Sequence, residues 1–265
     1  MILDIIVKDK KEELDVVKSR LPLKDLKSKV RDAAPGLDFA AALVHPDRVT
    51  IIAEVKKASP SKGLIRADFD PVAIAAVYEK NGAKAISVLT EKRHFMGDLS
   101  FLAEIRKKVN IPLLRKDFIF DEYQVYEAKA NGADAFLLIA AILETSRMQD
   151  LYMLGKELGM ETLAESHDER DLEKVLECGF NVVGINNRNL NTFDVDIKTT
   201  ERLMRDIPNE KVIVSESGIS SMDDIRYLKK IGADAALIGE AIMRQQDYGK
   251  KLRELAYNTV SGREQ

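Results

Sequence analysis

Ionisable side chains and amides follow six short apolar runs of this chain. The groups are Glu54 with Lys56, Lys116, Glu165, Asn186 with Arg188, Glu216, and Gly239-Glu240. Carboxylates and ammonium groups held together give and take protons, so the residue types indicate acid–base chemistry. Each group taken singly fits a solvated loop. Six such groups, each at the end of an apolar run, indicate one shared site instead.

Glu54 and Lys56 are two residues apart in the run IIAEVKK. In a strand, residues at this spacing point to the same face, so both side chains would point into the same interior. An unpaired buried charge is very costly, which means that the two residues are either paired or functional. A salt bridge within the barrel remains the structural alternative to a catalytic pair.

Eight short segments are predicted to be strands, because they are apolar and are separated by helix-sized stretches. They are Val49–Val55, Ala85–Leu89, Pro112–Lys116, Ala135–Ile139, Glu161–Glu165, Val182–Asn186, Val212–Ser215 and Ala235–Ile238. Three of these strands belong to similar segments of sequence, NGAKAISVL, NGADAFLLI and IGADAALIG. In each phrase the glycine suits the left-handed position that ends many helices.

Strict alternation of strand and helix predicts an α/β fold with a parallel sheet. Eight units in 265 residues favour closure into a (β/α)8 TIM barrel over residues 49–265, with an N-terminal helical extension over residues 1–48. The G-x-G-x-x-G turn that is typical of an open dinucleotide-binding sheet is absent. Active sites of such barrels lie at the carboxyl ends of the strands, where the six groups fall.

Residues 1–48 carry an apolar stripe at helical spacing, made of Leu3, Ile6, Leu14, Val17 and Leu21. This segment either covers the mouth of the barrel or packs against its closed bottom, and the sequence favours neither. Helix starts are predicted at Asp121, Asp168 and Ser221, and a short helical tail leads to the end of the chain.

Glycines after the last two predicted strands indicate a phosphate site. Ser217-Gly218 precedes a capped helix and Gly239 opens another, so backbone N–H groups would be exposed there. In barrels, phosphate binds recurrently after strands 7 and 8.

The composition excludes several other classes of protein. The net charge is only −3 although 32 % of the residues are charged, which argues against nucleic-acid binding. One cysteine and three scattered histidines make a metal site unexpected, and no cofactor motif is present. No apolar run is long enough for a membrane span and the start does not resemble a signal peptide, so a cytoplasmic protein is expected.

The segments IIAEVKKASPSKG, IPLLRKDFI, LAESHD, GINNRNL, VSESGI and ALIGEA resemble the indole-3-glycerol phosphate synthase family. The similar segments occur in chain order across residues 50–243, and Asp38–Leu43 is similar to the extension of that family. Met96 and Asp98 stand where other residues are usual in the family.

The resemblance implies a ring closure in tryptophan biosynthesis. Carboxyphenylamino-deoxyribulose phosphate loses CO2 and water and becomes indole-3-glycerol phosphate, with no cofactor and with the phosphorylated small molecule as the only implied partner. Lys116 matches the acid for the ketone oxygen, and Glu165 matches the carboxylate near the developing cation. Glu54 and Lys56 match an acid–base pair for loss of water, although the sequence leaves open which lysine serves which step.

The resemblance also implies the remaining site residues. They are the catalytic Asn186 and Glu216, the substrate-lining Arg188, the substrate or phosphate contacts Ser59, Ser217, Gly218 and Gly239, and the ring contacts Phe95 and Phe118. Two alternatives remain: an aldolase that uses Lys116 as a Schiff base, and a non-catalytic barrel that binds a phosphorylated metabolite.

Overall fold

The computed structural model describes residues 2–31, 33, 35–189 and 192–257, so residues 258–265 of the predicted tail lie outside the described part. The strands are β1 (Thr50–Val55), β2 (Ala58–Ser59), β3 (Gly63–Leu64), β4 (Ala85–Leu89), β5 (Leu113–Lys116), β6 (Ala135–Ile139), β7 (Glu161–Ser166), β8 (Val182–Asn186), β9 (Val212–Glu216) and β10 (Ala235–Ile238). The helices are α1 (Ile2–Arg20), α2 (Leu23–Val30), α3 (Phe39–Leu43), α4 (Pro71–Lys80), α5 (Ser100–Arg106), α6 (Glu122–Ala130), α7 (Thr145–Glu157), α8 (Glu169–Glu177), α9 (Lys198–Leu203), α10 (Met222–Ile231), α11 (Glu240–Met243) and α12 (Tyr248–Ala256), with short 3-10 turns at Ala140–Ile142 and Met204–Asp206.

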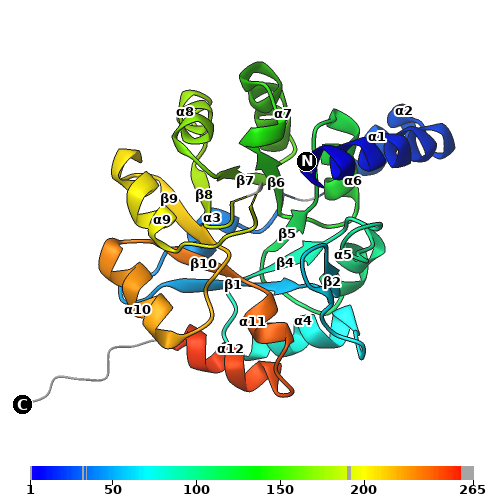
Figure 1. Ribbon diagram of the computed structural model, residues 1–265. Coiled ribbons are helices and arrows are strands. Elements are labelled where there is room, and N and C mark those ends of the chain that lie inside the picture. Colours follow the sequence, from blue (N-terminus) through cyan, green and yellow to red (C-terminus); the bar gives the residue numbers. More distant parts are fainter. Residues whose placement is uncertain (1, 32, 34, 190–191, 258–265) are drawn as a thin grey trace, which may run out of the picture.

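The long strands form a closed parallel barrel in the order β1-β10-β9-β8-β7-β6-β5-β4, in which β4 also pairs with β1 (Figure 1). Helices surround the strands on the outside of the barrel (Figure 1). The predicted (β/α)8 fold is therefore confirmed. Each predicted strand coincides with an observed one to within one residue at either end. No helix of the described ranges is long and apolar enough to cross a membrane.

The predicted helix starts carry side-chain caps. Asp121 accepts a hydrogen bond from Tyr123 N and forms a capping box with Gln124 at the start of α6. Ser221 and Asp224 form the capping box of α10, and Asp168 caps α8. These caps satisfy N–H groups that have no partner within a helix, so local sequence fixes where each helix begins.

Apolar side chains fill the barrel in two layers. One cluster lies between the strands and the surrounding helices, and includes Ile86, Phe136 and Ile225. The other cluster fills the inside of the barrel, and includes Leu114 and Leu163. The interior is therefore a packed core, and the charged side chains of the cavity lie at its carboxyl end.

The N-terminal extension divides between the two ends of the barrel. Side chains of α1, including Ile6, line the cavity at the carboxyl mouth. Phe39 and Leu43 of α3 pack with the inner core at the other end, where Thr50 Oγ1 donates to Leu43 O over 2.7 Å. In Figure 1, α1 and α2 lie beside α6, whereas α3 lies behind the strands. Each of the two alternatives for this segment thus holds for a different part of it.

One element is not predicted from the sequence. The antiparallel pair β2–β3 forms a small hairpin between β1 and α4, with Ser59 paired to Gly63. Strands of two residues give no periodic signal, so only the structure shows the hairpin.

Truncating Phe39 tests whether the far end of the extension is structural. The side chain of Phe39 is fully buried, so we expect Phe39→Ala to lower the free energy of unfolding by about 3–5 kcal/mol. The KM for substrate should stay unchanged because the active site lies at the other end. Urea unfolding and steady-state kinetics check both points, with the exposed Leu37→Ala as the control. A raised KM with unchanged stability would contradict this interpretation.

Candidate active site

A cavity of about 220 Å³ opens at the carboxyl mouth of the barrel. All thirteen site residues that were expected from the sequence line it. They are Glu54, Lys56, Ser59, Phe95, Lys116, Phe118, Glu165, Asn186, Arg188, Glu216, Ser217, Gly218 and Gly239. The structure therefore brings together residues from seven of the barrel's strands or the loops that follow them.

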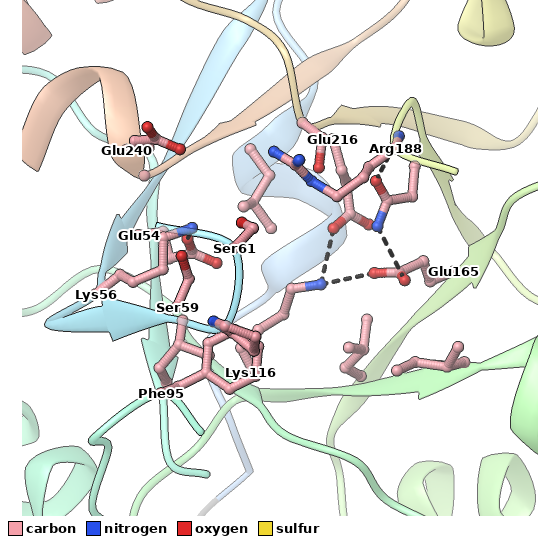
Figure 2. Close-up of a pocket in the computed structure, with 18 of the residues that line it drawn as sticks. Glu54, Lys56, Ser59, Ser61, Phe95, Lys116, Glu165, Arg188, Glu216 and Glu240 are labelled. Carbon is pink, nitrogen blue, oxygen red and sulfur yellow. Dashed lines mark hydrogen bonds and ion pairs between the residues drawn. The ribbon is translucent and has the colours of Figure 1, made fainter. Parts of the chain in front are cut away.

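Lys116 lies at the centre of this site (Figure 2). Its Nζ donates to Glu165 Oε2 over 2.6 Å and to Glu216 Oε2 over 2.9 Å. The two carboxylates are almost fully buried, and Lys116 is the cation that they share. Breaking such a pair would leave a buried charge uncompensated, so the geometry holds the ammonium group in one place.

The surroundings drive the pKa values of the two carboxyl groups apart. Burial and the adjacent Glu165 raise the pKa of Glu216 to about 7, although Lys116 opposes both effects. Burial also raises the pKa of Glu165, but Lys116 and His167 lower it by more, and it lies well below the ordinary value. Such a divergence distinguishes a permanently ionised carboxylate from one that can exchange a proton near neutral pH.

The pKa of Lys116 is raised above its ordinary value. Burial lowers this pKa, but Glu165, Glu216 and Glu54 raise it by more. The ammonium group therefore carries its proton throughout the neutral range, as a proton donor to a strongly basic oxygen must.

Glu54 and Lys56 form a second ion pair on the other side of the cavity (Figure 2). Lys56 Nζ lies 2.5 Å from Glu54 Oε2, as the period-two spacing predicts. Gly239 makes room for this pair, because a Cβ atom there would lie 2.2 Å from Glu54 Oε2. A glycine expected to contact phosphate thus also has a steric role beside a carboxylate.

Asn186 connects the central cluster to the loop that follows β8. Its Nδ2 donates to Glu165 Oε1 over 3.1 Å, and its Oδ1 accepts from Arg188 N. Asn187, which is buried, donates to Ser217 O over 3.0 Å. The two amides therefore orient the carboxylate of Glu165 and hold the turn at Ser217.

The turn after β9 precedes a capped helix, as the sequence predicts. Ser217 and Gly218 both have positive φ angles, 68° and 78°, and they form a turn that precedes α10 by several residues. The start of α10 is capped by Ser221 and not by this turn. Gly239 does stand directly before α11, as expected.

Phe95 and Phe118 form an aromatic side of the cavity, with their ring centroids 6.1 Å apart. The buried Glu91 accepts hydrogen bonds from the backbone N–H groups of His94 and Phe95, and so shapes the loop that carries Phe95. Met96 is exposed with φ 53°, and Asp98 accepts from Ser100 N at the start of α5. Neither of these two unusual residues lines the cavity.

Two kinds of site residue are not found by sequence reasoning. Ile2, Leu3 and Ile6 of α1 line the cavity. The N-terminal apolar stripe predicts that this helix packs against the barrel, but the sequence does not show at which end. His167 lies beyond Glu165, with Nε2 3.1 Å from Glu165 Oε1 and Nδ1 3.3 Å from Asp171 Oδ2. The spacing of His167 could have indicated these contacts, because it lies two residues after Glu165 and four residues before Asp171.

Among the described residues, no group of three or more His, Cys, Asp or Glu side chains is arranged to hold a metal ion. The polar groups of the cavity instead form pairs of carboxylate and ammonium. Such pairs are suited to moving protons on a small anionic molecule.

Solved structures with the same architecture share little sequence with this chain. The 3-hexulose-6-phosphate synthase of Salmonella typhimurium superposes with a TM-score of 0.61 at 14 % identity, over 79 % of this chain and 98 % of that chain. A thiamine phosphate pyrophosphorylase from Pyrococcus furiosus gives 0.58 at 14 %, over 79 % and 94 %. These similarities show the fold alone. The closed barrel and the cluster of paired charges at its mouth are typical of a TIM-barrel enzyme.

The particular family follows from sequence comparison. The family model described as indole-3-glycerol phosphate synthase matches residues 3–255. The indole-3-glycerol phosphate synthase of Acetivibrio thermocellus is 50 % identical over 96 % of this chain and 98 % of its own length. That of Dehalococcoides mccartyi strain CBDB1 is 51 % identical over 96 % and 100 %. The chain belongs to the indole-3-glycerol phosphate synthase family, a family of carboxy-lyases of tryptophan biosynthesis, as the sequence motifs predict.

Adding a methyl group at Gly184 tests the placement of Glu216. A Cβ atom there would lie 2.4 Å from Glu216 Oε1, so the carboxyl group must move away from its present position beside Lys116. We expect Gly184→Ala to lower kcat by about 10- to 100-fold and stability by only about 1–3 kcal/mol. Kinetics and urea unfolding measure both effects. The control is Val183→Ile, which adds a methylene group on the outer face of the same strand, and an equal loss of kcat in that variant would refute the steric argument.

The pH dependence of stability tests the His167 contacts. Burial lowers the pKa of His167, but Asp171 and Glu165 raise it by more, from 6.5 to about 9. The stabilisation is therefore fully present below pH 6.5 and is lost as the pH rises towards about 9. It is on the order of 3 kcal/mol.

We expect His167→Gln to flatten the decline in unfolding free energy between pH 6.5 and 9, as measured by urea unfolding at several pH values. His45→Gln, at the other end of the barrel between α3 and β1, is the control. Parallel curves for wild type and His167→Gln would rule out this source of stability.

Proposed function

We propose that Lys116 is the general acid of the ring closure that defines this family. In this reaction a ring carbon of the substrate attacks a ketone, and the ketone oxygen gains negative charge and needs a proton. The position of Lys116 Nζ between Glu165 and Glu216 is the observation that carries the proposal. Two buried carboxylates keep this ammonium group charged and directed into the cavity, where it meets the developing alkoxide.

Glu165 is the carboxylate that stabilises the cation developing on the ring nitrogen. Its low pKa supports this role, because the group stays ionised while the positive charge forms. Asn186 and His167 hold the same carboxylate from two other directions, which preserves its orientation.

Glu216 is a proton-exchanging carboxyl group of the site. A pKa of about 7 allows the group both to receive and to release a proton near neutral pH. Its contact with Lys116 over 2.9 Å gives a direct route by which the lysine can regain its proton after the ring closes.

Glu54 and Lys56 carry out the loss of water that follows loss of CO2. The two groups contact each other over 2.5 Å at a distinct position of the cavity, apart from the Lys116 cluster (Figure 2). A paired acid and base in one place can remove a proton and protonate the leaving hydroxyl group. This assignment gives each lysine of the site its own step.

The substrate's phosphate would lie near the turn of Ser217 and Gly218, the start of α11 at Gly239, and Ser59. Backbone N–H groups in such turns bind anions, and Gly218 and Gly239 carry no side chain that would block a close approach. Arg188 supplies local positive charge although the chain as a whole carries −3. The substrate's aromatic ring would contact Phe95 and Phe118, which form the apolar side of the cavity.

The enzyme is expected to act in the cytoplasm on a free small molecule, without a nucleic-acid partner. The near-balanced net charge and the enclosed, small-molecule-sized cavity support this expectation. The extension of residues 1–48 and the barrel of residues 49–265 would act as a single unit, since α1 lines the same cavity as the strands.

Removing the Lys116 amine is the direct test. We expect Lys116→Ala to abolish turnover, because it removes the proposed acid. The fold should survive with lower stability, because no core packing is lost although Glu165 and Glu216 lose the cation that they share. Product formation is followed by the fluorescence of indole-3-glycerol phosphate, and folding by circular dichroism. The exposed Lys108→Ala serves as the control. Near-normal turnover in Lys116→Ala would refute the role of this lysine.

Borohydride trapping distinguishes the acid role from Schiff-base chemistry. A general acid forms no covalent bond to the substrate, so no reduced adduct on Lys116 is expected when borohydride and substrate are present together. A trapped adduct, located by peptide mass analysis, would favour the aldolase-like alternative.

A further inference from the structure

Lys10 interrupts the apolar stripe of α1 and is nevertheless buried. It lies four residues after Ile6 and four before Leu14, so it shares their face of the helix. Its side chain is only 6 % exposed. Burying a lysine is costly unless its charge is paired, so the contacts of this ammonium group need a physical explanation.

The partner of Lys10 is the residue that directly follows Lys116. Lys10 Nζ lies 3.0 Å from Asp117 Oδ2, and the side chain of Asp117 is fully buried. The same carboxylate accepts from Thr90 Oγ1 over 2.5 Å and from Arg115 over 3.0 Å. A second charge contact joins Lys10 to Glu13, 3.4 Å away on α1.

Arg115 precedes Lys116 in β5 and belongs to the same cluster. It is 1 % exposed, and it pairs with Glu127 of α6 over 2.8 Å and donates to Gln124 O. Because side chains alternate along a strand, Arg115 and Asp117 lie on the outer face while Lys116 points into the cavity. Both neighbours of the proposed acid are therefore fixed by buried charges.

The buried part of the cluster is balanced in charge when α1 is docked. Its four least exposed members are Lys10 and Arg115, with two positive charges, and Asp117 and Glu127, with two negative ones. Glu13, the second partner of Lys10, is 21 % exposed, so water stabilises its charge. Without Lys10, a buried negative charge beside Lys116 would be left uncompensated, and the end of β5 would have to adjust to reach water or another cation.

We propose that Lys10 is a positioning residue for catalysis, which acts through Asp117 to hold the end of β5 and thereby the ammonium group of Lys116. The N-terminal helix then has two separate roles. Ile2, Leu3 and Ile6 cover the substrate, and Lys10 sets the geometry of the acid. The inference rests on the proposed role of Lys116.

The test compares Lys10→Met, which keeps the length and the packing of the side chain but removes the charge, with Lys8→Met. Lys8 is exposed on the same helix and serves as the matched control. At a temperature well below unfolding, we expect Lys10→Met to lower kcat by about 10- to 100-fold with KM within about threefold of wild type. Lys8→Met should leave both constants unchanged.

The double variant Lys10→Met with Asp117→Asn shows whether Lys10 acts through Asp117. In the double variant both charges of the Lys10–Asp117 pair are removed, so neither is left unpaired. The kcat of the double variant should therefore be no lower than that of the single variant with the lower kcat. Independent, multiplicative losses would overturn the proposal. Lys10→Gln, which keeps a hydrogen-bond donor towards Asp117, is measured in parallel in case Lys10→Met does not fold, and a lowered kcat with little change in KM is again expected.

Three other results would also overturn the proposal. One is a wild-type kcat in whichever Lys10 variant folds, even with a lower melting temperature, because Lys10 would then be purely structural. Another is a raised KM at unchanged kcat, because α1 would then act only as a cover. The last is failure of both variants to fold, which would make Lys10 a residue of stability. A turnover-competent Lys116→Ala, by contrast, would refute the proposed acid itself.

Discussion

The balance of charge at the barrel mouth is the constraint on which the site depends. A closed barrel with an apolar interior offers little solvent to its inward-facing ionised groups, so every charge there needs a partner within contact distance. Lys116 meets this need for two carboxylates, and Lys56 meets it for Glu54. The same pairing sets the pKa differences that make the groups useful, so structural stability and proton chemistry have one origin.

Two glycines, Gly184 in β8 and Gly239 directly after β10, complete this arrangement. Any side chain at Gly184 or Gly239 would occupy the space of the carboxylates of Glu216 and Glu54. These glycines serve the packing of charged groups and not a special backbone conformation, since neither has a positive φ. The barrel thus makes room for these two carboxylates where a neighbouring strand, or the turn directly after one, has no side chain.

Most of the fold and the lining of the site follow from local sequence. Parallel strands that are buried on both faces appear in the sequence as short apolar runs. Capping residues such as Asp121 and Ser221 determine where the helices start. Parallel strands bring their carboxyl ends to one mouth, so residues after different strands meet without further information. The contacts of Lys10 and His167, the β2–β3 hairpin and the division of the extension were not predicted. The contacts of Lys10 and the division of the extension depend on pairings across long stretches of chain. The hairpin and the His167 contacts are local, but two-residue strands give no periodic signal and the sequence does not show where the His167 ring points.

The extension precedes its docking sites in the chain. α1 contacts Asp117, and the Thr50 that holds α3 pairs in register with Ala235 of β10. Contacts so distant in the chain form slowly, because closing a long loop costs entropy before the contact repays it. During synthesis α1 leaves the ribosome before these partners do, so Ile2, Leu3 and Ile6 stay uncovered until much of the barrel exists. An enzyme built in this way acquires its covered mouth late in folding, and partly folded chains would have an open, inactive one.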